Sequence, residues 1–205
     1  MEHIDVIFYI NLESRTDRKE HFLSEIKKVC IDESKIVRVD AIKDAYGALG
    51  CTKSHIKALE LFMANPLWLT CMIFEDDYTF YNTDIIHNNN LLKSFFQNFT
   101  DWGMLLLSSN QAGRPSIKTH IDSVELVTYS QTTSGYCIHK DSVKELYDNF
   151  KESAELLEKS KSKPKHALDM YWNKLKMKRY SFKPNMGHQY VSYSDIEKRV
   201  VHYQC

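Results

Sequence analysis

The apolar run at residues 69–74 leads without a break into three carboxylates, Glu75, Asp76 and Asp77. A run of this length with little polar interruption is typical of a β-strand that is covered on both faces of its sheet. Neighbouring carboxylates repel one another and resist leaving water. A chain with this segment therefore requires a covered sheet and a positive partner for the charges at the strand's end.

The rest of the chain alternates similar strands with amphipathic segments. We expect further strands at residues 6–10, 36–39, 104–107, 124–129 and 133–139, and helices at 14–29, 52–65, 91–99, 141–157 and 168–175. Strands that alternate with helices predict an α/β fold with a mostly parallel sheet, whose ligands lie beyond the carboxyl ends of the strands. The length favours one domain over residues 1–205, with a mobile lysine-rich loop at about 159–165.

Composition excludes several classes of partner. The 27 basic and 27 acidic residues cancel, so no overall field attracts nucleic acid or anionic lipid. Neither a leader sequence nor a window as long as a membrane span is present, and we expect a cytoplasmic protein without membrane insertion.

The five cysteines are odd in number and widely spaced, which favours reduced thiols. None of the six glycines belongs to a glycine-rich phosphate-binding loop.

The three carboxylates also suggest a metal site. On an extended backbone, Glu75 and Asp77 point to one side and Asp76 to the other. Two carboxylates on one side suit a hard cation such as Mn²⁺ or Mg²⁺. The alternative is an acidic turn that is simply hydrated. We favour the metal because the buried strand delivers these groups to the expected ligand crevice.

Several motifs, taken in their order along the chain, resemble those of glycosyltransferase family 25. They are Ile10-Asn11-Leu12 with Arg15 and Arg18, Gly47 with Gly50-Cys51 and Ser54-His55, Ile73-Phe74-Glu75-Asp76-Asp77, Ser134-Gly135-Tyr136, Asp169 and Gln189. The family includes bacterial lipooligosaccharide galactosyltransferases and the collagen galactosyltransferases. Each motif alone is weak, and their shared order makes the resemblance specific.

The resemblance implies a GT-A fold and the inverting transfer of a hexose, with galactose as the expected sugar, from a UDP-sugar to a carbohydrate or hydroxylated acceptor. It implies Mn²⁺ or Mg²⁺ held by Glu75 and Asp77, with His188 as third ligand, and Asp169 as the base. The residues it assigns to donor binding are Asn11, Arg15, Arg18, Gly50, Cys51, Ser54, His55, Asp76 and Gln189.

Spacing alone leaves other interpretations open. Arg15 and Arg18 can form solvent-exposed helix pairs with neighbouring acids. Cys51 and His55, four residues apart, can be a packed cysteine beside a hydrogen-bonded histidine rather than a catalytic or zinc pair. Asp169 can cap a helix or pair with a nearby lysine.

Two other functions remain possible for the same fold. One is a binding or structural module in which the acidic triplet is only a turn. The other is a metal-dependent phosphohydrolase, which is less favoured because no Asp-x-Asp nucleophile follows the first strand.

Overall fold

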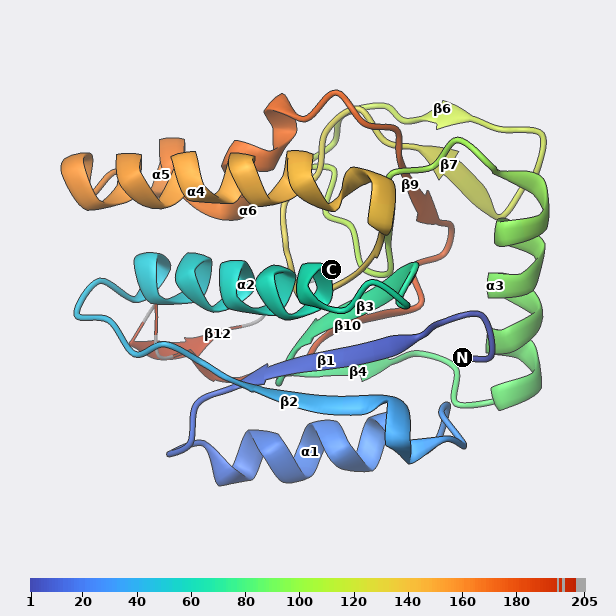
Figure 1. Cartoon of the computed structure of the whole chain (residues 1–205), viewed down its shortest axis with the longest axis horizontal. Coiled ribbons are helices and arrows are strands. Elements are labelled where there is room, and N and C mark those ends of the chain that lie inside the picture. Colours follow the sequence, from blue (N-terminus) through green and yellow to red (C-terminus); the bar gives the residue numbers. More distant parts are fainter. Residues whose placement is uncertain (195, 197, 202–205) are drawn as a thin grey trace.

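A computed structural model of the chain describes residues 1–194, 196 and 198–201. Its centre is an eight-stranded sheet in the order β2-β1-β3-β8-β5-β9-β7-β6, with helices on both faces (Figure 1). Strands β7 and β8 run against the other six. The predicted α/β fold, with a mostly parallel mixed sheet flanked by helices, is confirmed.

The elements have the following bounds. The large sheet contains β1 (Val6–Asn11), β2 (Ile36–Asp40), β3 (Thr70–Glu75), β5 (Met104–Leu106), β6 (Ile117–Lys118), β7 (Val124–Leu126), β8 (Gly135–His139) and β9 (Arg179–Phe182). Two small antiparallel pairs are β4 (Tyr78–Phe80) with β10 (Gly187–Gln189) and β11 (Ser192–Ser194) with β12 (Arg199–Val201). The helices are α1 (Thr16–Ile26), α2 (Gly47–Ala64), α3 (Ile85–Asn98), α4 (Val143–Ser160), α5 (Lys163–His166) and α6 (Leu168–Tyr171), with 3₁₀ turns η1 (Glu33–Lys35), η2 (Lys140–Ser142) and η3 (Trp172–Lys174).

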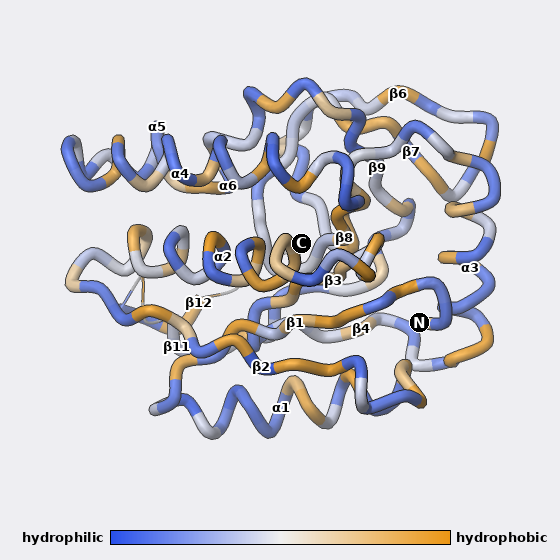
Figure 2. The backbone as a smooth tube through the Cα atoms, in the orientation of Figure 1, coloured by the Kyte–Doolittle hydropathy of each residue, from blue (hydrophilic) through white to orange (hydrophobic). Residues whose placement is uncertain are grey.

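Each face of the sheet has its own apolar core. Helices α1 and α3 cover one face, where Phe22 packs against β1 and β3 and Phe95 packs against β9. Helices α2 and α4 cover the other, with Phe62 and Phe150 buried there. Because successive strand residues point to opposite faces, a strand covered on both faces is apolar throughout. Figure 2 shows this as apolar residues gathered on the central strands, while α1 and α4 alternate apolar and hydrophilic residues.

The observed helices differ from the prediction at their ends. Helix α2 begins at Gly47 and α3 at Ile85, both earlier than apolar spacing indicated. Four polar residues, His87 to Asn90, separate Ile85 and Ile86 from the apolar residues that begin at Leu91, and the Asp84 side chain accepts hydrogen bonds from two backbone amides at the helix start. The lysine-rich segment 159–165 is not a loop throughout, because it includes the end of α4 and most of the short helix α5. The described cysteines are free thiols, as predicted, and Cys205 lies outside the described residues.

The carboxyl ends of β1, β2 and β3 meet at one edge of the sheet. Ile10 of β1 is in register with Glu75 of β3, and the Glu75 amide donates to the Ser134 carbonyl just before β8 at 2.9 Å. The amino-terminal half of α2 also reaches this edge, where Ser54 Oγ accepts a hydrogen bond from the Ile42 amide at 2.8 Å. No described helix is long and apolar enough to cross a membrane.

Replacing Gly50 with Ala is expected to destabilise the fold by about 1–3 kcal/mol. A Cβ atom at Gly50 would lie 2.6 Å from the carbonyl oxygen of Ile42, so the loop before α2 would have to move. Urea unfolding measures the change. Gly47→Ala on the same helix is the matched control, because its Cβ would meet nothing closer than 3.2 Å. Equal losses in both variants would show that close approach of the backbone is not the cause.

Candidate functional site

A cavity of about 570 Å³ opens at the edge where β1 and β3 end. Its walls come from the start of α2, residues 131–133, helices α5 and α6, and, near the end of the described chain, Gln189, Ser194, Ile196, Lys198 and Val201. Most of the residues that the sequence singles out line it, namely Arg15, Arg18, Cys51, Ser54, His55, Glu75, Asp76, Asp77, Asp169 and Gln189. The fold therefore brings together motifs that are more than 100 residues apart in the chain.

The three carboxylates do not follow an extended backbone, because the chain turns at Asp76 and Asp77 before entering β4. Glu75 consequently joins one group of side chains, and the two aspartates join another. The sequence-based picture of Glu75 and Asp77 on one side, with Asp76 opposite, is therefore wrong about the backbone. The turn therefore determines which of the three carboxylates share a positively charged partner.

Arg18 from α1 supplies the positive charge that the strand's end requires. Its Nη1 lies 3.1 Å from both Asp76 Oδ1 and Asp77 Oδ2. Its Nη2 donates to Ser192 Oγ at 2.8 Å and to the Tyr193 carbonyl at 3.0 Å. A solvent-exposed helix pair is therefore wrong for Arg18.

Arg15 lies beside Arg18 but bonds differently. Its Nη2 contacts Asp17 Oδ2 at 2.8 Å, and its Nη1 donates to the Tyr193 carbonyl at 3.1 Å. Arg15 thus pairs with a neighbouring acid, but it precedes α1 and its side chain is only 14% exposed, so this is not the solvent-exposed helix pair considered from spacing. Arg15 is the N-cap residue of α1 and its side chain makes no cap hydrogen bond.

Asn11 joins the end of β1 to the acidic turn. Its Nδ2 donates to Asp76 Oδ2 at 2.7 Å and to the Arg15 carbonyl at 3.0 Å, while Oδ1 accepts from Arg38 Nε at 3.1 Å. The side chain is buried and its amide is bonded on both sides. Asn11 therefore positions Asp76 and the start of α1 from behind the cavity wall.

Burial dominates the electrostatics of the turn. Burial raises the pKa of Asp76, although Arg18 and the hydrogen bond from Asn11 favour its ionised form. Burial also raises the pKa of Asp77 to about 7, with Arg18 opposing the change and the charges of Glu75 and Asp76 adding to it. Burial acts in the same direction on Glu75, but hydrogen bonds from His55 and Thr133 outweigh it and lower the pKa of that carboxyl.

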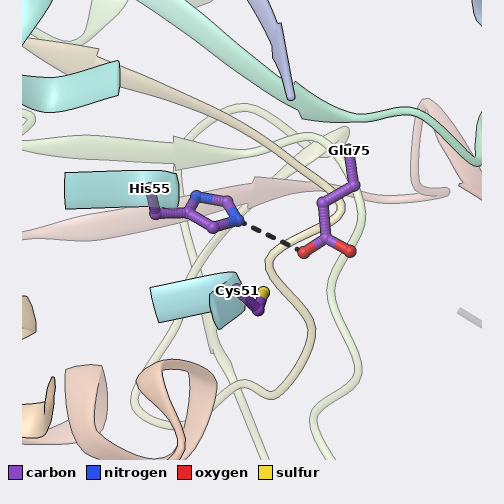
Figure 3. Close-up of side chains that lie close together, drawn as sticks. All are labelled: Cys51, His55 and Glu75. Carbon is purple, nitrogen blue, oxygen red and sulfur yellow. Dashed lines mark hydrogen bonds and ion pairs between the residues drawn. The ribbon is translucent and has the colours of Figure 1, made fainter. Parts of the chain in front are cut away.

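Glu75 faces two side chains on α2 (Figure 3). His55 Nε2 lies 3.4 Å from Glu75 Oε1, and Thr133 Oγ1 donates to the same oxygen at 2.7 Å. His55 Nδ1 lies 3.0 Å from the Tyr136 hydroxyl. One potential ligand atom from each of Cys51, His55 and Glu75 lies within 4.8 Å of the others.

Asp169 lies in the first turn of α6 and contributes a carboxylate to another wall of the cavity. Its Oδ2 accepts a hydrogen bond from the Thr132 amide at 3.3 Å. Burial raises the pKa of Asp169, with the charge of Glu75 acting in the same direction, while Thr132 and Lys163 oppose the change. A carboxylate with a raised pKa is a better proton acceptor than an ordinary aspartate.

Gln189 and His188 are neighbours on β10 and differ in placement. Gln189 lines the cavity and its side chain bonds to Asp77, which favours the ionised carboxylate. The His188 ring stacks on Tyr81 at 4.6 Å between ring centroids and does not line the cavity. The structure therefore does not bring His188 together with Glu75 and Asp77.

Gly50 and Ser54 serve the site indirectly. Ser54 Oγ donates to the Gly50 carbonyl at 2.7 Å and accepts from the Ile42 amide, so the pair ties the loop before α2 to the helix. Sequence reasoning missed Thr132 and Thr133, whose contacts arise because β8 pairs antiparallel with β3. Their place directly before the Ser134-Gly135-Tyr136 motif was the only available signal.

Replacing Arg18 with Lys is expected to lower stability by about 1–2 kcal/mol, because an ammonium group lacks the planar fork that reaches Asp76 and Asp77 together. Chemical unfolding measures the change. Lys19→Arg is the control, because it lies in the same turn of α1 but is not the residue that bridges Asp76 and Asp77. An Arg18→Lys protein as stable as the wild type would show that bridging both carboxylates is unimportant.

Comparisons with known proteins identify structural likeness but no family. No protein-family model matches the chain, and no curated protein matches it. A glycosyltransferase involved in glycosylation of the major capsid of PBCV-1 is 11% identical, with 76% of this chain and 67% of that chain covered and a TM-score of 0.47. A mutant Drosophila β-1,4-galactosyltransferase 7, solved with manganese, UDP-Gal and xylobiose, is 9% identical, with 97% and 75% covered and a TM-score of 0.43.

A third similar structure is that of a synthase. The 4-diphosphocytidyl-2C-methyl-D-erythritol synthase of Anaerococcus prevotii is 12% identical, with 96% of both chains covered and a TM-score of 0.44. All three TM-scores lie below 0.5. Likeness at this level does not assign an activity, so the function must be argued from the site itself.

Proposed function

We propose that the chain is a metal-dependent glycosyltransferase of the GT-A type, which moves a hexose from a UDP-sugar to a carbohydrate or hydroxylated acceptor with inversion. The supporting observation is that the acidic turn after β3 and the separate carboxylate Asp169 line one cavity of about 570 Å³. A cavity of this size is typical of small-molecule sites. The ordered motifs that resemble family 25 favour galactose as the sugar.

The acidic turn suits a divalent cation. Asp77 Oδ1 is buried and has no hydrogen-bond partner among the described residues, and a buried carboxylate oxygen without a partner is costly. Oxygen ligands of this kind suit Mn²⁺ or Mg²⁺, which Glu75 and Asp77 would hold. When bound, such an ion offsets the negative charge that accumulates on departing UDP.

The chain's own residues would position the donor. Arg15 and Arg18 line the cavity, where their positive charge would attract a diphosphate. Arg18 also holds the acidic turn in place through Asp76 and Asp77. In the proposal, Asp76 contacts the ribose or the sugar, and Gln189 contacts the diphosphate or the sugar.

Asp169 would act as the base. Inverting transfer requires a group that accepts the acceptor hydroxyl's proton while its oxygen attacks the anomeric carbon on the face opposite UDP. Asp169 reaches the cavity from α6, a different element from the acidic turn, and burial raises its pKa toward the range useful for proton transfer. The Thr132 amide donates to one of its oxygens and so helps to position the carboxylate in the cavity wall.

Calorimetry with UDP and UDP-galactose, with and without Mn²⁺, tests the proposal. We expect binding that requires Mn²⁺ and is lost on adding a chelator, with ADP-glucose as the control nucleotide. Slow release of UDP from the donor in the presence of Mn²⁺ would distinguish an enzyme from a binding module. Absence of binding by every uridine compound would overturn the proposal, and release of inorganic phosphate would favour a phosphohydrolase.

A further inference from the structure

We propose that Cys51, His55 and Glu75 form a binding site for Zn²⁺ in the wall of the cavity. One potential ligand atom from each residue lies within 4.8 Å of the other two, and Figure 3 shows the imidazole and the thiol of α2 facing the carboxylate at the end of β3. A thiolate, an imidazole and a carboxylate are all ligands that zinc accepts. This set differs from the oxygen ligands that suit Mn²⁺ or Mg²⁺, which have little affinity for a thiol.

The distances suit a tetrahedral ion. Two nitrogen or oxygen ligands about 2.05 Å from a tetrahedral zinc lie about 3.3 Å apart. His55 Nε2 and Glu75 Oε1 are 3.4 Å apart, which is long for a hydrogen bond and close to that separation. Cys51 precedes His55 by one helical turn, so both side chains lie on the same face of α2. The thiol lies within 4.8 Å of both other ligand atoms.

The ligands are also held from behind, as zinc ligands usually are. The His55 ring is fully buried, it lies against Tyr136 and Phe150, and its Nδ1 is 3.0 Å from the Tyr136 hydroxyl. That contact leaves Nε2 as the nitrogen directed at the site. Thr133 Oγ1 fixes the Glu75 carboxylate at 2.7 Å. These partners determine the ligand orientations before any metal arrives.

The site has an entry path and an open position. All three ligand residues line the cavity, so an ion can reach them from solvent. Three protein ligands leave a fourth tetrahedral position for water or a bound molecule, which is the pattern of open zinc sites. On binding, the Cys51 thiol loses its proton to solvent and the thiolate sulfur forms the bond to zinc, with no change of oxidation state.

Zinc at this site would compete with the proposed donor metal, because Glu75 belongs to both ligand sets. We therefore expect Zn²⁺ to weaken Mn²⁺-dependent donor binding. The zinc site itself does not require the glycosyltransferase proposal to be correct, since it rests on the geometry of Cys51, His55 and Glu75.

Titration of metal-free protein with Co²⁺ and Zn²⁺ tests the site. We expect one equivalent of Co²⁺ to produce a thiolate-to-cobalt charge-transfer band in the near ultraviolet, and Zn²⁺ to remove it. Cys51→Ser should abolish the band and weaken Zn²⁺ binding in calorimetry. Cys30→Ser is the matched control and should retain both, because Cys30 lies in the core on the other face of the sheet.

A second variant changes the residue that positions His55 and keeps all three ligands. Tyr136→Phe removes the hydroxyl beside His55 Nδ1 and should weaken Zn²⁺ binding about 10- to 100-fold while retaining the cobalt band. A folded wild-type protein without the band, or a band that persists in Cys51→Ser, would overturn the proposal. Circular dichroism verifies folding of each variant.

Asp77→Asn separates this proposal from the glycosyltransferase function. Asp77 is not one of the three zinc ligands, so the variant should retain the cobalt band and bind Zn²⁺ like the wild type. The same variant should lose Mn²⁺-dependent binding of UDP. Loss of the band in Asp77→Asn would contradict the zinc site, whereas loss of UDP binding alone would leave it intact.

Discussion

Asp169→Asn is expected to lower kcat for sugar transfer by about 10²- to 10⁴-fold, because the amide does not accept the proton of the acceptor hydroxyl. The change is nearly isosteric, and the Asn oxygen can still accept the hydrogen bond from the Thr132 amide. The cavity and the fold should therefore be preserved. Donor affinity should remain unchanged, because Asp169 belongs to α6 and not to the acidic turn.

Steady-state kinetics with a UDP-sugar and an acceptor measure this effect, and calorimetry measures donor affinity separately. Burial raises the pKa of Asp169, so the wild-type kcat/KM should fall as pH drops through that raised pKa. The residual rate of Asp169→Asn should lack this fall. Asp141→Asn is the matched control, since the Asp141 side chain is 89% exposed. A kcat near that of the wild type would exclude Asp169 as the base.

Asp77→Asn is expected to weaken Mn²⁺-dependent binding of UDP by at least about 100-fold, since even partners outside the coordination sphere of a metal contribute up to that much. Asp77 lies in the cavity wall, and one of its buried oxygens has no hydrogen-bond partner among the described residues. Calorimetry with and without Mn²⁺ measures the loss. Unchanged Mn²⁺-dependent affinity would show that the ion binds elsewhere.

The same substitution should stabilise the metal-free protein at high pH. Burial raises the pKa of Asp77 from 3.8 to about 7, so between these values the folded state keeps a proton that the unfolded state has lost. The resulting stability is complete below about pH 4 and is lost as pH rises through about 7, by up to about 4 kcal/mol in all. An asparagine does not ionise, and it avoids this loss.

Urea unfolding of metal-free wild type and Asp77→Asn, from pH 4.5 to pH 8, measures this difference. The free energy of unfolding of the wild type should fall over that range relative to that of the variant, and Mn²⁺ should restore part of it. Arg18 remains paired with Asp76 in the variant, so the turn keeps a positive partner. Parallel pH profiles for the two proteins would show that Asp77 is ionised in the folded state throughout.

Sequence reasoning was most successful for the central strands. The apolar runs predicted β1 and β3 closely, and β3 ends at Glu75, the first residue of the acidic triplet, beside the cavity. Periodicity located most elements but misplaced helix starts, as at Gly47 and Ile85, because glycines in the first turn of α2 and the polar run at residues 87–90 of α3 interrupt the apolar spacing. Most of the candidate residues line one cavity, since the carboxyl ends of neighbouring parallel strands converge there.

The sequence alone determined the covered α/β sheet and the position of the carboxylates at its edge, because a strand that is buried on both faces consists mainly of apolar residues. Which charges share a partner was decided only by the tertiary structure. The turn after Glu75 places Asp76 and Asp77 beside Arg18. Helix α2 places His55 beside Glu75. Such contacts depend on backbone direction and on segments far apart in the chain, and local periodicity contains no information about either.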